Sequence, residues 1–130
     1  MEYKFTIDLK PITKKNSQRI IRDGTGRLRI VQSTAYLKYE KQCHSFMPDI
    51  ETIECRVNVK AVYYMPNRRR VDLTNLHEAL HDILVHYKVL KDDNCAIIVS
   101  TDGSYVDVDK WHPRTEVTIT ELAENDLGGD

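Results

Sequence analysis

Residues 72–82 read DLTNLHEALHD, and their side chains suit two different kinds of metal chemistry. Within them, HEALH is an H-E-x-x-H pattern, in which two histidines one helical turn apart bind Zn²⁺ and the glutamate activates the bound water. Asp72, Asn75 and Asp82 instead offer the hard oxygen ligands that Mg²⁺ prefers. The stretch therefore predicts either a zinc hydrolase or a magnesium-dependent enzyme.

The zinc interpretation relies on His77, Glu78 and His81, and it lacks the third protein ligand that a catalytic zinc requires. The position that holds glycine in the extended zinc pattern is Leu84. At 100° per residue, His77 and His81 lie on one margin of the helix's apolar face, where half-exposed side chains are expected. The other histidines have no informative spacing: His44, His86 and His112. Zinc hydrolysis is the weaker alternative.

The oxygen-rich interpretation extends beyond the helix. Metal-assisted cleavage of a phosphodiester needs clustered oxygen ligands, because Mg²⁺ prefers an octahedron of carboxylates, carbonyls and waters. The chain offers Asp72 at a helix start, Asn75 and Asp82 further along, and Asp92 and Asp93 in the following loop. Asp72 and the loop residues also have structural explanations, since Asp72 can cap the helix and KDDN can form a turn. Both explanations stay open at this point.

Positive charge is concentrated before Asp72. Arg68, Arg69 and Arg70 immediately precede that segment, and arginine suits bidentate contacts to phosphate. Residues 1–70 carry 15 Lys and Arg against 7 Asp and Glu, whereas residues 71–130 carry 4 against 13. Such asymmetry indicates a polyanionic partner for the basic half. Alternatively, the two halves interleave in the fold and neutralise one another.

The elements that must position these residues follow from periodicity and turn signals. The element order β-β-β-α-β-α-β-β indicates an α+β fold, in which two main helices pack on one mixed β-sheet. The expected strands are Tyr3–Leu9, a hairpin of 18–22 and 27–31 around a turn at Asp23–Gly26, 53–65, 95–100 and 115–122. The expected helices are 33–47 and 72–87.

A chain of 130 residues suits a single domain, which we assign to residues 1–122. Residues 123–130 form an acidic tail that we expect to be disordered. Cys43, Cys55 and Cys95 form no C-x-x-C motif, which is typical of reduced thiols. No apolar run is long enough to span a membrane, and the N-terminus lacks a signal-peptide pattern. We therefore expect a cytoplasmic protein with no membrane partner and no small-molecule cofactor.

In their order and spacing, these features resemble the RusA-type Holliday junction resolvases, small endonucleases of bacteria and prophages. The segments that carry the resemblance are DLKPITKKNSQRI, M-P-x-R-R-R at 65–70, D-L-x-N-L at 72–76, D-I-L at 82–84, D-D at 92–93 and T-I-T-E at 118–121. The resemblance implies a RusA-like fold and a homodimeric, Mg²⁺-dependent endodeoxyribonuclease, with Mn²⁺ as a substitute cofactor. Such an enzyme resolves four-way DNA junctions by paired nicks during recombination and repair. A two-fold dimer suits a two-fold junction because it supplies two matched sites.

The resemblance also assigns roles by position. It implies that Asp72, Asp92 and Asp93 are catalytic metal ligands, and we expect Asn75 and Asp82 to support them. The expected DNA contacts are Lys14, Lys15, Asn16, Arg68, Arg69 and Arg70.

Two positions depart from the family pattern. Thr74 stands where the family has an aspartate, and Glu78 stands where its type member has a functional lysine. Asp82 or Glu78 could replace the missing carboxylate, and Lys14, Lys15 or Lys91 could replace the missing cation. The loss at Thr74 also permits an alternative, a relative that binds junctions without cutting them.

Overall fold

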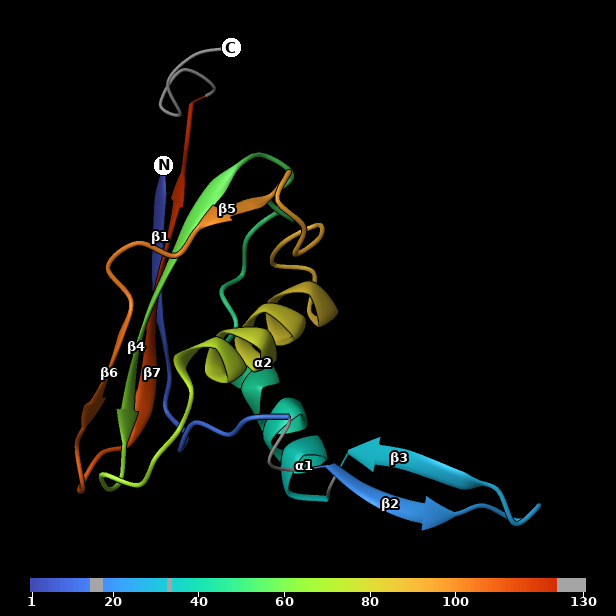
Figure 1. Ribbon diagram of the computed structural model, residues 1–130. Helices are drawn as coiled ribbons and strands as arrows, with labels where there is room; N and C mark the ends of the chain where they lie inside the picture. The colour runs from blue at the N-terminus through green and yellow to red at the C-terminus, as the bar shows by residue number, and fades with distance from the viewer. Residues whose placement is uncertain (15–17, 33, 124–130) are drawn as a thin grey trace.

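A computed structural model of the chain describes residues 1–14, 18–32 and 34–123 (Figure 1). The strands are β1 (Glu2–Ile7), β2 (Gln18–Arg22), β3 (Leu28–Gln32), β4 (Val57–Met65), β5 (Ile98–Ser100), β6 (Tyr105–Val108) and β7 (Arg114–Glu121). The helices are α1 (Thr34–Cys43), continued by a 3₁₀ turn at His44–Phe46, and α2 (Leu73–His86). The predicted tail lies outside the described residues, apart from Ala123.

The main sheet is mixed, as the sequence predicts. Its order is β1-β7-β4-β5, and β6 also pairs with β4. Strand β7 is antiparallel to both β1 and β4, whereas β5 and β6 are parallel to β4. Strand β5 pairs with the start of β4 and β6 with its end, and Gly103 lies in the turn between them with a φ of 88°. A side chain there would also crowd Lys60, since an added Cβ would lie 3.1 Å from its Cδ.

Both helices cover one face of this sheet (Figure 1). Alternate residues of β4 point into the core from Val57 to Tyr63, and α2 adds residues at helical spacing from Leu76 to Leu84. This arrangement confirms the predicted α+β fold class. The fully enclosed core residues include Ile7, Tyr36, Cys43, Val57, Val59, Ala61, Tyr63, Leu76, Ile83, Leu84, Leu90, Val117 and Ile119.

Several elements differ from the prediction, including β1, which ends at Ile7, and α1, which ends at Cys43. Strand β4 starts at Val57, because Ile53 makes only an isolated bridge with Leu90. Residues 95–97 form a turn before β5, in which the amides of Ile97 and Ile98 both donate to the Asn94 carbonyl. Residues 105–108 form the strand β6, which local alternation did not single out.

Strands β2 and β3 form a separate two-stranded sheet that projects beyond α1, away from the main sheet (Figure 1). The predicted turn is present, since the Asp23 amide donates to the Arg27 carbonyl at 3.0 Å. The Asp23 carboxylate accepts the amides of Thr25 and Arg27 and the Thr25 hydroxyl, which holds the tip in one conformation. No helix within the described ranges is long and apolar enough to cross a membrane. All three cysteines are free, with Cys43 buried and Cys55 and Cys95 exposed.

Candidate metal centre and nucleic-acid interface

Asp72 begins α2 but does not cap it with its side chain. Its backbone carbonyl accepts the amides of Asn75 and Leu76, while the carboxylate accepts only a long 3.4 Å bond from Asn75 Nδ2. The carboxylate is exposed at the positive end of a helix dipole. Asp72 therefore occupies the N-cap position without a side-chain capping bond, and its carboxylate oxygens remain available to a ligand.

Asp92, Asp93 and Asn94 form a tightly bonded acidic loop after α2. The two Asp92 carboxylate oxygens accept the Asp93 amide at 2.7 Å and Asn94 Nδ2 at 3.1 Å. Asn94 Oδ1 in turn accepts the Ala96 amide at 2.9 Å. Loss of solvation, a side-chain hydrogen bond with Asp92 and the charge of Asp82 together raise the pKa of Asp93. The loop is a turn, but it is one that crowds like charges together.

Lys14 reaches this acidic region from the N-terminal loop. Its Nζ donates to Asp82 Oδ2 at 2.6 Å and lies 5.9 Å from the centre of the Tyr36 ring. The bond to Asp82 raises the pKa of Lys14, and the charges of Glu78 and Glu40 add to that effect. The structure therefore joins a predicted DNA contact to a predicted supporting ligand. Lys15 and Asn16 lie outside the described residues.

The predicted metal ligands lie in two separate regions of the chain, near the two ends of α2. Asp72 and Asp82 are ten residues apart along α2, which corresponds to about 15 Å of helical rise. Asp82 interacts with Asp93 through their charges, so the acidic loop belongs with the later turns of α2. Among the residues that the structure describes, no three His, Cys, Asp or Glu side chains are grouped closely enough to hold a metal ion.

The donor set nevertheless fits magnesium. Mg²⁺ is commonly bound through one or two carboxylates, several waters and the phosphates of its substrate. Asp72 lies next to Asn75, and Asp92 lies next to Asp93, so each pair offers two neighbouring side-chain oxygen ligands. The three aspartates are exposed. Neither group needs a third protein ligand to fit such an ion.

The arginine turn that precedes α2 lies beside Asp72. Arg68, Arg69 and Arg70 are exposed, and none of the three forms an ion pair with a described residue. One pocket is lined by Arg70, Val71, Asp72 and Asn75. A second pocket joins Arg69 and Arg70 to the segment Lys10–Thr13. Lys10, which was not among the predicted DNA contacts, lies in the same basic loop as Lys14.

The two histidines of the HEALH segment face the core. His77 is only 9% exposed, and its Nδ1 is 2.7 Å from the Tyr63 hydroxyl. The His77 and His81 rings stack at 5.5 Å, and neither buried Nε2 has a hydrogen-bond partner among the residues that the structure describes. Burial lowers the pKa of His77, and burial together with His77 lowers that of His81 to about 4. The predicted half-exposed position was wrong for His77, because Tyr63 supplies a partner inside the core.

The charge asymmetry of the sequence does not divide the sheet. Strand β7, from the acidic half, lies between β1 and β4 of the basic half. Ion pairs also cross the division, including Lys14 with Asp82 and Lys91 with Glu54. The interleaving alternative is therefore correct for the sheet, and positive charge remains concentrated only locally, as at the arginine turn.

Comparison with known families agrees with these features. The profile described as Endodeoxyribonuclease RusA matches residues 8–120, which include both groups of candidate ligands and the arginine turn. No curated protein sequence matches the chain. The matched range covers nearly the whole chain, and the chain therefore belongs to the RusA family of endodeoxyribonucleases.

Proposed function

We propose that this protein is a Mg²⁺-dependent, structure-selective endonuclease that resolves Holliday junctions by paired nicks as a homodimer in DNA recombination and repair. Membership of the RusA family implies junction resolution. The observation that carries the proposal is the pocket shared by Arg70, Asp72 and Asn75. A guanidinium can hold a phosphate there directly beside a carboxylate that is free to bind a metal ion.

The remaining catalytic groups are assigned from their contacts. When bound, Mg²⁺ supplies an activated water and stabilises the charge that develops on the departing oxygen. The Asp92 and Asp93 carboxylates are neighbours, and the charge of Asp92 contributes to the raised pKa of Asp93, so a nearby cation would stabilise the ionised form of Asp93. Lys14 occupies the acidic surroundings of Asp82 and Glu78, so it is our candidate for the cation that the family pattern places at Glu78.

The separation along α2 supports a dimer. Because Asp72 and Asp82 are about 15 Å apart along the helix, Asp72 cannot share an ion with the Asp82 end of α2. Two protomers related by a two-fold axis could place Asp72 of one beside the acidic loop of the other. Each dimer would then have two composite sites, as paired nicking requires.

Substitution of Asp93 tests the proposal. Asp93→Asn should abolish nicking of a labelled four-way junction in Mg²⁺ while junction binding is retained. Because the change removes one of several crowded negative charges, the free energy of unfolding should be unchanged or higher, which separates lost catalysis from lost folding. Asp102→Asn is the matched control, since this exposed residue bonds to Asn58 only through its backbone. Full cutting by Asp93→Asn refutes the assignment.

A second candidate function follows from Thr74. This residue is exposed in the first turn of α2, where the family pattern has an aspartate. A chain that lacks this carboxylate could bind junctions without cutting them. Junction binding with no nicking in either Mg²⁺ or Mn²⁺ would favour this alternative.

A further inference from the structure

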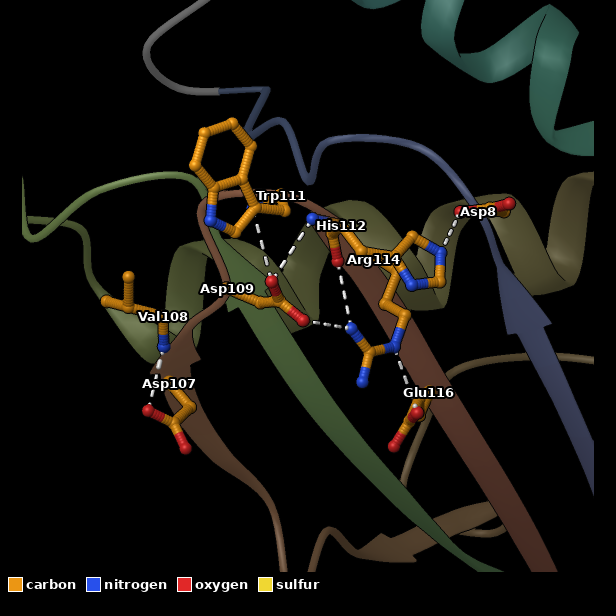
Figure 2. A network of polar contacts seen from close by, with 8 residues as sticks. All are labelled: Asp8, Asp107, Val108, Asp109, Trp111, His112, Arg114 and Glu116. Atoms are coloured by element: carbon orange, nitrogen blue, oxygen red, sulfur yellow. Dashed lines mark hydrogen bonds and ion pairs between the residues drawn. The ribbon is translucent and has the colours of Figure 1, made fainter.

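Trp111 is the only tryptophan of the chain, and 87% of it is exposed. It lies in the loop between β6 and β7, and its indole ring points away from the neighbouring Arg114 (Figure 2). Single exposed apolar residues are common on protein surfaces. The surroundings of Trp111 give this one a more specific interpretation.

The loop that carries Trp111 is held rigidly. Asp109 Oδ1 accepts the amides of Trp111 at 3.2 Å and His112 at 3.1 Å, and its Oδ2 accepts Arg114 Nη1 at 2.9 Å (Figure 2). Arg114 also donates to Glu116 at 3.0 Å and lies 3.9 Å from the centre of the Tyr64 ring. The backbone of this loop therefore has little conformational entropy left to lose on binding.

The loop also lies at the end of the sheet that carries the arginine turn. The Asp109 amide donates to the Met65 carbonyl at 2.9 Å, immediately before that turn begins. One pocket is lined by Arg68–Arg70 on one side and Val106–Val108 on the other. Lys110 Nζ lies 5.0 Å from the centre of the indole ring, which adds a cation beside the aromatic face.

Three of the four nearby carboxylates contact a basic side chain: Asp8 contacts His112 Nε2, and Asp109 and Glu116 are bonded to Arg114 (Figure 2). The fourth, Asp107, lines the pocket beside the arginines and, within the described part of the chain, accepts only the Val108 amide. The three arginines of the turn have no such partner among the described residues. The surface around Trp111 therefore combines an exposed aromatic ring with unpaired positive charge, as surfaces that bind unpaired nucleotides do.

We propose that Trp111 stacks on the exposed face of a base at the branch point of the DNA, where stacking on the next base pair is interrupted, while Arg68–Arg70 hold the adjoining phosphates. This inference rests on the proposed function, because it names how the same enzyme recognises its substrate. Stacking on an aromatic ring is tolerant of sequence, since every base has a flat face. A base within an intact duplex is already stacked on its neighbours, so the contact selects for branched structure. Stacking on Trp111 would depend on the branched structure of the DNA, whereas the phosphate contacts of the arginine turn depend on charge alone.

The intrinsic fluorescence of Trp111 gives a direct readout, because no other tryptophan contributes to the emission. Wild-type protein is titrated without divalent cations, in parallel, with a four-way junction and with a duplex of the same arm sequence. Stacking predicts that the junction quenches the emission strongly and that the duplex has a much smaller effect. Anisotropy of labelled DNA follows binding independently in the same samples.

Two variants complete the test. Trp111→Ala should weaken junction binding by about tenfold, as expected for loss of one base–aromatic contact, and should change duplex binding little. Trp111→Phe keeps a flat ring and should restore most of the affinity. The exposed position means that neither variant should affect folding.

The outcomes separate this inference from the proposed function. Junction binding with unchanged emission and unchanged affinity in Trp111→Ala overturns the stacking contact alone. Failure of the wild-type protein to bind the junction overturns both. Emission that shifts with protein concentration but not with DNA overturns stacking in favour of a contact between two copies of the chain.

Discussion

Stability of the metal-free protein should fall as the pH drops from 6.5 towards 4, because of the histidines within α2. The pKa of His81 is about 4 in the folded chain, against about 6.5 for an unperturbed histidine. Burial is the main cause, the stacked His77 adds to it, and Asp82 opposes it. Between these pH values the unfolded chain binds a proton that the folded chain does not, so acidification favours unfolding.

The size of the effect follows from the shift. For His81 alone, the two pKa values give a loss of up to about 2.5 kcal/mol between pH 7 and pH 4.5. Because the His81 ring is partly exposed, solvent screens part of this effect, and we expect a loss of about 2 kcal/mol in the free energy of unfolding. The pKa of His77 is lowered too, so it contributes in the same direction.

Urea denaturation at a series of pH values measures this effect. His81→Leu removes the titrating group from a largely apolar site, so the variant should lose less stability than wild type on acidification. Leu37→Gln is the control, because Leu37 is exposed and does not titrate, so its replacement should leave the pH dependence unchanged. An identical pH dependence in wild type and His81→Leu would refute the reasoning.

Three further predictions concern the site. If sites are shared between protomers, mixing Asp72→Asn with Asp93→Asn protein should restore nicking, since half of the sites in mixed dimers are intact; inactive mixtures would place each site within one protomer. Lys14→Gln should lower the nicking rate at least tenfold with little change in junction binding, and single-turnover kinetics will show whether binding alone is affected. Arg69→Ala and Arg70→Ala should each reduce the salt dependence of binding by about one counterion; an unchanged slope, measured by anisotropy against salt, would exclude these residues as phosphate contacts.

Much of the fold could be predicted because the local pattern and the long-range packing agree. The alternation in β4 and the helical spacing of Leu76, Ala79, Leu80 and Ile83 match the faces that are buried. Strand β6 escaped prediction, since Tyr105–Asp107 are all exposed and alternation has no buried face to reflect. Its conformation depends on parallel pairing with β4, a partner about forty residues away that no local pattern encodes.

The candidate site shows the same limit. Types and spacing of residues made Asp72, Asp93 and the arginine turn candidates, because metal ligands and phosphate contacts have characteristic side chains, and the family resemblance then assigned their roles. The bond between Lys14 and Asp82 joins residues 68 positions apart and could not be read from either segment. Burial of His77 depends similarly on Tyr63, which lies on the facing strand β4. Contacts between secondary-structure elements therefore decide which candidate site residues lie next to one another.

The most direct test of the account is cleavage of a four-way junction labelled on opposing strands, with and without Mg²⁺. We predict two symmetric nicks that require the metal ion and are both made within one binding event, and we predict no comparable cutting of the matched duplex. Stable junction binding with no nicks in Mg²⁺ or Mn²⁺ would contradict it.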